Sequence, residues 1–161
     1  MEIRPATLAD LPAIGRLGAA LVVEHHAFDP LRFLAPPADI AERYAGFIGG
    51  QLGKTDSIIL VAEQAGRVVG YTYASLEGFD FMALRGPAGA IQDIIVDESV
   101  RRQGVGRALL EAVIAQLAAK GAPQVVLSTA QKNVGAQALF ERSGFRRTMI
   151  EMTRDLDRGS H

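Results

Sequence analysis

The chain has 161 residues, of which 48% are hydrophobic and 22% are charged, a composition typical of a globular domain with a substantial apolar core. The absence of cysteine excludes disulfides, thiolate nucleophiles and cysteine-ligated zinc, and it is compatible with a cytoplasmic location. A formal net charge of −1 gives no overall field that would attract nucleic acid, so no nucleic-acid partner is expected.

No composition shift, repeat or low-complexity segment interrupts the chain, so one domain is expected over residues 1–158. Residues 159–161 follow Arg158 in a sequence that resembles the start of an engineered histidine tag. The first residues do not form a signal peptide, and no apolar run reaches membrane-spanning length. We therefore expect a soluble cytoplasmic protein without a membrane partner.

The first half of the chain predicts a strand, two helices and a hairpin. A short strand is expected at 2–5, and a capped helix with one buried face at 7–24. A weaker helical pattern covers 38–50. Two β-rich runs at 57–63 and 68–76 are separated by a turn that contains glycine, which is typical of a β-hairpin.

Strands and helices alternate in the second half. The hairpin-rich order favours a mixed α/β sandwich over an all-parallel, doubly wound fold. The expected elements are an irregular connection at 78–89, strands at 91–96 and 124–129, a helix from 104 or 105 to about 120, a helix from Asn133 to Ser143, and a β-rich tail at 145–156.

The stretch from Ala90 to Lys120 reads as a strand, a polar turn with two glycines, and a helix. Glycine lets the backbone bend closely around a ligand, and the first amides of a helix are unpaired, so the turn predicts an anion site. A mononucleotide P-loop is excluded because Arg107 and Ala108 stand where lysine and serine or threonine are needed. A dinucleotide fingerprint is weak, because position 109 is leucine rather than glycine. A plain strand-to-helix turn is the alternative.

Two motifs together resemble the GNAT superfamily of acyl-coenzyme A-dependent N-acetyltransferases. The first is V-D-E-S-V-R-R-Q-G-V-G-R-A-L-L, in which Arg101, Gly104 and Gly106 fill the pattern (Q/R)-x-x-G-x-(G/A). The second is N-V-G-A-Q-A-L-F-E-R-S-G-F, and the N-terminal I-R-P-A-T-L-A-D is similar to the usual family opening. The matching positions of the second motif are Asn133, Ala136, Leu139, Gly144 and Phe145.

The resemblance implies a GNAT-like fold, with a mostly antiparallel mixed sheet, a splayed parallel pair of strands and about four flanking helices. It also implies that acetyl-coenzyme A (acetyl-CoA) binds with its pyrophosphate at the amides of 102–107 and its pantetheine arm between the strands at 91–96 and 124–129. One amide of the first strand would polarise the thioester carbonyl. The cofactor-binding residues expected on this basis are Ile94, Ile95, Val96, Arg101, Arg102, Gln103, Gly104, Val105, Gly106, Arg107, Asn133 and Phe140.

Asp93 is the leading candidate for the catalytic base or for a substrate carboxylate, with a purely structural role as the alternative. Gln92 is expected to orient the substrate but cannot act as a base. Phe140 stands where the family often has a tyrosine that protonates the leaving thiolate. Water or Tyr73 would then assist, or the protein binds coenzyme A without turnover. Glu24 and His26 are expected near the substrate, although such a loop is often only solvated.

The function expected from these residues is direct transfer of acetyl from acetyl-CoA to a primary amine of a small cationic molecule. A protein N-terminus or lysine is the alternative acceptor. A CoA-binding regulatory module that has lost catalysis and a nucleotide-binding module are the alternatives from other classes. Acetyl-CoA is expected as co-substrate, no metal is expected, and a homodimer is left open.

Overall fold

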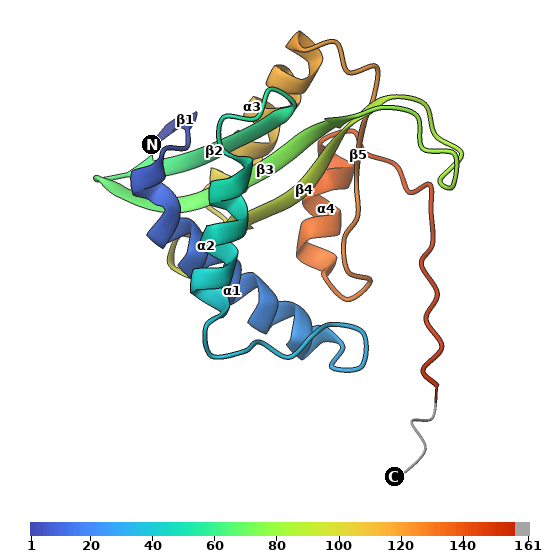
Figure 1. The fold of residues 1–161 in the computed structure, drawn as a ribbon, viewed down its shortest axis with the longest axis horizontal. Coiled ribbons are helices and arrows are strands. Elements are labelled where there is room, and N and C mark those ends of the chain that lie inside the picture. The colour runs from blue at the N-terminus through green and yellow to red at the C-terminus, as the bar shows by residue number, and fades with distance from the viewer. Residues whose placement is uncertain (157–161) are drawn as a thin grey trace.

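One five-stranded sheet organises residues 1–156, which a computed structural model describes (Figure 1). The sheet has the order β1-β2-β3-β4-β5, and helices lie on both of its faces. The strands are β1 (Glu2–Pro5), β2 (Ser57–Gln64), β3 (Arg67–Glu77), β4 (Ala88–Val96) and β5 (Val125–Leu127). The helices are α1 (Leu11–Phe28), α2 (Ile40–Gln51), α3 (Val105–Ala119) and α4 (Val134–Arg142), with 3₁₀ turns at Leu8–Asp10 and Glu98–Val100.

The sheet is antiparallel from β1 to β4, whereas β4 and β5 run parallel. The parallel pairing covers three residues of each strand, from Gly89 opposite Val125 to Ile91 opposite Leu127. β4 then continues for five residues without pairing to β5. This confirms the expected mixed α/β sheet of the GNAT type, in which the two parallel strands separate toward one end.

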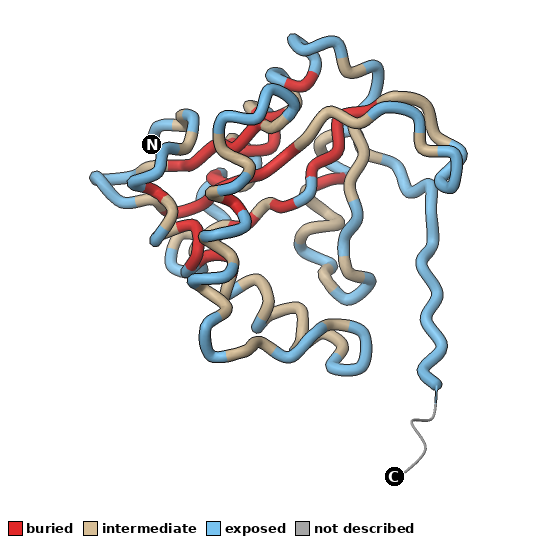
Figure 2. Tube along the Cα trace, in the orientation of Figure 1, coloured by how far each residue is buried: buried red, intermediate tan, exposed pale blue. Residues whose placement is uncertain are grey.

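Two apolar cores lie on opposite faces of the sheet. One core packs α1 and α2 on the sheet through residues such as Ile14, Ile48 and Val61. The other packs α3 through Leu109 and Leu117, and it includes Phe140 of α4. Figure 2 shows that the buried residues follow the strands and the inward faces of the helices. The helical spacing of apolar residues in the sequence therefore identified the buried faces correctly.

A β-bulge at Gln92 of β4 places the side chains of Ile91 and Asp93 on opposite faces of the sheet. Tyr73 of β3 pairs with Asp93, but the next residue, Ala74, pairs with Ile91, so Gln92 is an extra residue without a partner. Alternate residues of a regular strand share a face, and a bulge breaks that alternation. Ile91 accordingly packs in the core on the α3 side, whereas Ile95 packs in the core on the α1 side.

The prediction of a β-rich tail at 145–156 was wrong, because these residues contain no strand in the structure. Its β-rich composition is real, but a strand requires a neighbouring strand for its backbone hydrogen bonds, and this tail has none in the described residues. Three elements also differ in their boundaries: β4 begins at Ala88 rather than at 91, β5 covers 125–127 rather than 124–129, and α1 ends at Phe28 rather than near 24. The suggested tag at 159–161 lies outside the described residues.

Gly15→Ala should destabilise the contact between α1 and α2. An added Cβ would lie 2.5 Å from the backbone oxygen of Ala41, so the two helices would have to move apart. We expect the free energy of unfolding, measured by urea titration, to fall by about 1–3 kcal/mol. Gly46→Ala in α2 is the control, because nothing lies within 4 Å of its added Cβ and alanine favours a helix by about 0.5–1 kcal/mol. Equal destabilisation by both substitutions would contradict this packing.

Candidate functional site

The bulge places Asp93 among tyrosines on the face of the sheet that α1 and α2 cover. Its side chain is buried, with 9% of the residue exposed, and it contacts the hydroxyl of the fully buried Tyr71. The hydroxyls of Tyr71 and Tyr44 lie 2.6 Å apart. Since a hydroxyl has one proton, Tyr71 accepts from Tyr44 when it donates to the Asp93 carboxylate. The three groups form a hydrogen-bonded chain from β4 to α2.

Burial governs the electrostatics of the hydrogen-bonded side chains of Asp93, Tyr71 and Tyr44. Desolvation raises the pKa of the Asp93 carboxyl to about 7 and also raises the pKa of Tyr71. No lysine or arginine of residues 1–156 forms an ion pair with Asp93. A carboxyl with a pKa near neutrality gains and loses a proton readily at physiological pH, which suits a general base.

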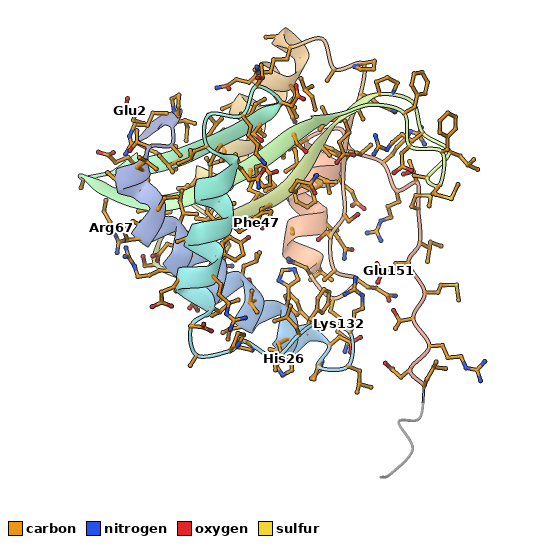
Figure 3. The ribbon with its side chains drawn as sticks, in the orientation of Figure 1. Glu2, His26, Phe47, Arg67, Lys132 and Glu151 are labelled. Atoms are coloured by element: carbon orange, nitrogen blue, oxygen red, sulfur yellow. The ribbon has the colours of Figure 1, made fainter. Side chains whose placement is uncertain are left out.

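Asp93 opens onto a cavity of about 500 Å³ between α1, α2 and the sheet. Aromatic and aliphatic side chains form most of its wall, and Asp93 is the only acidic residue among the described residues that line it. Figure 3 labels Phe47, which lies on α2 on this side of the sheet. Aromatic faces and one carboxylate favour a cation that carries an apolar group. The lining residues are Leu21, Tyr44, Phe47, Ile48, Tyr73, Gln92 and Asp93.

Gln92 lies at the same cavity but is exposed. Its Nε2 donates to Glu77 Oε1 at 2.9 Å and to Ser75 Oγ at 3.2 Å. Glu77 also pairs with Arg85, at 2.7 Å. The bulge thus turns Gln92 away from the core and toward polar groups of β3.

The turn before α3 has the geometry of an anion cradle. Gly104 has a φ of +84° and Arg102 has a φ of +61°, both in the left-handed region. The amide of Ala108 makes the first helical bond, to the carbonyl of Gly104 at 3.0 Å, so the amides just before it have no acceptor within the helix. No side chain caps this end of α3 in the described residues. An added Cβ on Gly106 would meet Leu139 at 3.4 Å, an ordinary contact, so the protein's own packing does not require glycine there.

The arginines of the turn have different surroundings. Arg101 donates through Nε to the carbonyl of Val96 at 3.1 Å, and its guanidinium pairs with Glu24 at 3.0 Å. Arg107 pairs with Glu111 one helical turn later, at 2.8 Å. Arg102 is exposed, and it forms no ion pair with any residue from 1 to 156. Through Arg101, Glu24 ties α1 to the end of β4, and its expected place near the substrate stays a prediction.

The two histidines at the end of α1 hold the following loop. His26 Nδ1 lies 3.0 Å from the carbonyl of Phe33, and His25 Nδ1 lies 2.8 Å from the carbonyl of Leu21. The His25 ring also packs edge-on against Phe28 and Phe33. Neither histidine lines the cavity at Asp93.

Asn133 and Phe140 belong to α4. Asn133 caps the helix by accepting from the amide of Ala136 at 3.2 Å, which confirms the predicted cap. Phe140 is 6% exposed and packs edge-on against Phe145, with ring centroids 6.0 Å apart. The structure therefore gives the Phe140 ring a packing role in the core.

Sequence reasoning missed Tyr44, Phe47 and Tyr71 as site residues. A signal for them existed: Tyr44 and Phe47 share the apolar side of the weaker helical pattern, and Tyr71 and Tyr73 alternate along one strand. What the sequence could not show is that α2 crosses the sheet opposite the bulge. Tyr73, suggested as a source of the thiolate's proton, lines the cavity, and its hydroxyl lies 3.4 Å from Gln51 Oε1.

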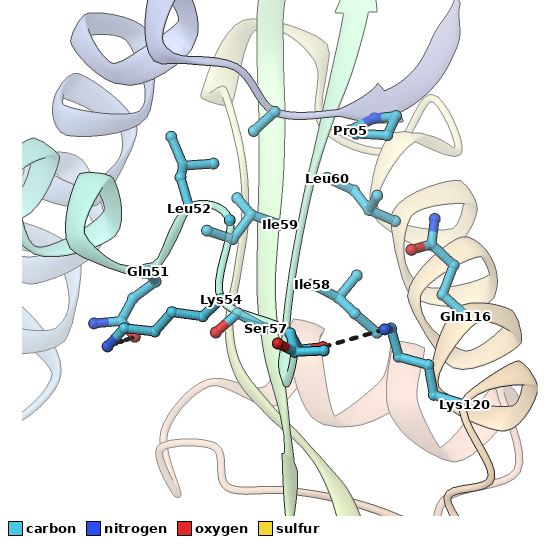
Figure 4. A pocket seen from close by; sticks show the side chains of 13 residues that line it. Pro5, Gln51, Leu52, Lys54, Ser57, Ile58, Ile59, Leu60, Gln116 and Lys120 are labelled. Carbon is cyan, nitrogen blue, oxygen red and sulfur yellow. Dashed lines mark hydrogen bonds between the residues drawn. The ribbon is translucent and has the colours of Figure 1, made fainter.

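Another cavity, of about 280 Å³, lies between the start of β2 and α3 (Figure 4). Lys120 reaches across from α3 and donates to the carbonyl of Thr55 at 3.2 Å. Lys54 donates to Gln51 at 3.1 Å. Asp93 and the turn before α3 do not line this cavity, and we assign it no role.

Residues 1–156 lack two features, a membrane-spanning helix and a cluster of metal ligands. No helix combines the length and apolarity needed to cross a membrane. No three acidic or histidine side chains lie close enough together to hold a metal ion.

A splayed parallel pair, a bulged strand and an uncapped helix after a glycine turn define an acyltransferase-like α/β fold. A family model described as the Acetyltransferase (GNAT) family matches residues 20–145. The chain therefore belongs to the GNAT family. Members of this family use acetyl-CoA.

Individual relatives agree with this assignment. A mycothiol acetyltransferase from Thermobispora bispora is 36% identical over 96 residues, which is 57% of this chain. The chain spans only 31% of that protein's length. An uncharacterized N-acetyltransferase from Bacillus subtilis, YhfO, is 26% identical over 90% of this chain and 89% of its own. The BH1408 protein from Bacillus halodurans, solved as a tetramutant, shares the fold with a TM-score of 0.80 at 23% identity, covering 97% of this chain and 100% of that chain.

Asp93→Asn should change how stability depends on pH. The pKa of Asp93 is about 7 in the folded protein, against 3.8 for an ordinary aspartate, so the folded state binds the proton more tightly and stability falls as pH rises between these values. Asparagine has no proton to lose. As pH rises from about 4 to about 8, the free energy of unfolding of the variant should therefore increase relative to that of the wild type by about 2–4 kcal/mol.

Urea titrations across this pH range measure the effect. Asp56→Asn, at an exposed position, serves as control and should keep the wild-type pH dependence. A difference between Asp93→Asn and wild type that stays constant with pH would show that Asp93 ionises normally.

Proposed function

We propose that the protein transfers acetyl from acetyl-CoA directly to the primary amine of a small cationic molecule, with Asp93 as the general base. The observation that carries this proposal is the placement of Asp93: a buried carboxyl with a pKa near 7, on a bulge, in the wall of an aromatic cavity. The bulged strand is also the one that separates from β5.

The residues of the glycine turn fit the pyrophosphate of coenzyme A. The left-handed Gly104 aims the free amides of Val105, Gly106 and Arg107 outward, where the helix dipole favours an anion. Gln103 and Arg102, which forms no ion pair within residues 1–156, lie in the same exposed turn. Arg101 supports the site indirectly by fixing the end of β4 to α1.

The pantetheine arm would lie where β4 no longer pairs with β5. Ile94, Ile95 and Val96 lie beyond the last residue pair of β4 and β5, so this edge of β4 has no strand partner within residues 1–156. An extended ligand can pair with such an edge as an added strand. Acetyl-CoA supplies the thioester, and a backbone amide aimed at its carbonyl oxygen stabilises the charge that develops there. One such donor contributes roughly 10²–10³ in rate.

The cavity beside Asp93 would hold the acceptor. Tyr44, Phe47 and Tyr73 offer aromatic surface, and Asp93 offers the charge that attracts an ammonium group. Gln92 and Glu77 form a hydrogen-bonded polar pair on the exposed side. Because Glu24 and His26 are bonded within the protein, we give them the supporting role of shaping the loop that follows α1.

The chemistry needs three proton transfers. Asp93 takes a proton from the ammonium group, and the free amine then attacks the thioester carbon. As the carbon–sulfur bond breaks, the nitrogen, which is positively charged after the attack, loses a second proton to water. The chain through Tyr71 and Tyr44 holds the carboxylate and offers a path for its proton. The departing thiolate takes a proton from Tyr73 or from water, because Phe140 has no proton to give.

A screen of amines, read by release of free thiol from acetyl-CoA, tests this function. We expect release that depends on the amine, saturates, and yields the acetylated amine. A protein N-terminus or lysine as the preferred acceptor would show release with peptides rather than small amines. Tight binding of acetyl-CoA without release for any amine would favour a regulatory CoA-binding module.

Asp93→Asn should lower kcat/KM for the amine by about 10²–10³, because asparagine cannot take up the proton. Wild-type kcat/KM should rise with pH through about 7, the pKa of Asp93, and this limb should be lost in the variant. Tyr71→Phe is the matched variant: it keeps the carboxylate but removes a hydrogen bond that stabilises the charged form, so the limb should move to higher pH. An unchanged pH profile in Asp93→Asn would remove Asp93 from the mechanism.

Gly104→Ala should weaken acetyl-CoA binding by about tenfold or more, because strain at φ +84° shifts the amides of the turn. Gly53→Ala is the matched control, with a φ of +78° and equally open surroundings at the end of α2. Both substitutions should cost about 1–2 kcal/mol of stability. Calorimetric titration with acetyl-CoA should separate them, and equal affinities would show that the turn does not hold the cofactor.

A further inference from the structure

The cavity at Asp93 combines one acidic group with an apolar wall. Its volume of about 500 Å³ is within the range of roughly 300–1,000 Å³ that small-molecule sites in proteins occupy. A ligand that fills it buries apolar surface on every side except where Asp93 and Gln92 lie. The apolar and aromatic residues among the described lining are Leu21, Tyr44, Phe47, Ile48 and Tyr73.

The aromatic rings form a fixed wall and an open mouth. The Tyr44 hydroxyl is bonded to that of Tyr71 at 2.6 Å, and the Tyr44 ring packs on Gly18 of α1, where an added Cβ would lie 2.1 Å from it. Phe47, about one helical turn further along α2, is 58% exposed and packs edge-on against Tyr73, with ring centroids 6.3 Å apart. Phe47 therefore lies at the mouth of the cavity, where an acceptor can contact its ring.

Two carboxylates outside the cavity already have partners for both of their oxygens. Glu77 Oε2 accepts from Arg85 at 2.7 Å, and its Oε1 accepts from Gln92 at 2.9 Å. Glu24 of α1 accepts from Arg101 at 3.0 Å and 3.4 Å. A second ammonium group on the acceptor would have to displace one of these charge-assisted bonds. The surroundings of the cavity therefore favour a molecule with a single positive charge.

The cavity also offers few partners for other polar groups. No lysine or arginine belongs to its described lining, so a carboxylate on the acceptor would lie near Asp93 without a counter-charge. The Tyr44 hydroxyl is bonded to Tyr71, and the Tyr73 hydroxyl lies 3.4 Å from Gln51 Oε1. Sugar hydroxyls that enter such a space lose hydrogen bonds to water without replacing them, which disfavours binding.

We propose that the acceptor is a primary monoamine that carries one compact apolar group, such as a ring of six atoms, and no second charge. Its ammonium group pairs with Asp93, and its apolar group fills the space between Ile48 and the rings of Phe47 and Tyr73. Phe47 is the residue that selects for the apolar group, because its exposed ring forms the mouth.

This inference rests on the proposed acetyl transfer and adds the chemical class of the acceptor. In the balanced reaction, the protonated amine and acetyl-CoA yield the N-acetylamine, coenzyme A with a free thiol, and one proton. The carbon–sulfur bond of the thioester breaks as the carbon–nitrogen bond of the amide forms.

Initial rates with four amines test the class, each read by release of thiol from acetyl-CoA: 2-phenylethylamine, ethylamine, putrescine and glucosamine. Ethylamine lacks the ring, putrescine adds a second charge, and glucosamine adds hydroxyls. We expect kcat/KM for 2-phenylethylamine to exceed that for each of the other three by about tenfold or more, since even one methylene in an apolar pocket changes kcat/KM by about 10-fold or more.

Variants at the mouth test the role of Phe47. Phe47→Ala should lower kcat/KM for 2-phenylethylamine by about tenfold more than for ethylamine, mainly through KM. Phe47→Glu places a free carboxylate at the mouth and should raise kcat/KM for putrescine relative to 2-phenylethylamine. Phe81→Ala is the matched control, because Phe81 is 78% exposed and does not line the cavity, so the wild-type selectivity should remain.

The possible failures can be told apart. Thiol release that favours putrescine or glucosamine would overturn this class of acceptor and leave the acetyl transfer in place. Equal losses for 2-phenylethylamine and ethylamine in Phe47→Ala would show that the Phe47 ring does not select the apolar group. No release with any of the four amines would instead contradict the transfer of acetyl to a small amine, on which the inference rests.

Discussion

The extra residue at Gln92 sets the register on which the candidate site depends. If Gln92 were paired as in a regular strand, Asp93 would share a face with Ile91, which packs in the apolar core on the α3 side. The bulge turns Asp93 toward Tyr71 and the cavity under α2, while β4 continues past the end of its pairing with β5. One local irregularity therefore brings together a carboxyl, an acceptor cavity and an unpaired strand edge.

Burial gives this arrangement its chemical character. A carboxyl that is nine-tenths buried, hydrogen-bonded to a tyrosine and distant from any ion-pair partner in the described residues has its pKa moved to about 7. The same desolvation disfavours the ionised carboxylate, so the site is maintained at some cost in stability, as is common where a group is tuned for catalysis. The glycine turn works differently, through backbone amides whose position Gly104 fixes.

Local patterns in the sequence predicted the elements that depend on local chemistry. The cap at Asn133, the glycine turn before α3 and the hairpin of β2 and β3 each follow from a few adjacent residues. The site at Asp93 was predicted only in part, because its tyrosines come from β3 and α2, which are far apart along the chain. The tail shows the opposite limit: its pattern indicates a strand, but strand formation depends on a partner that the pattern does not name.

A crystal structure with coenzyme A bound tests the central claim most directly, since one measurement locates both ends of the cofactor. We expect the pyrophosphate on the amides of Val105 to Arg107, the pantetheine arm along Ile94 to Val96, and the thiol at the cavity beside Asp93. Coenzyme A bound away from the gap between β4 and β5, or with its thiol remote from Asp93, would contradict it.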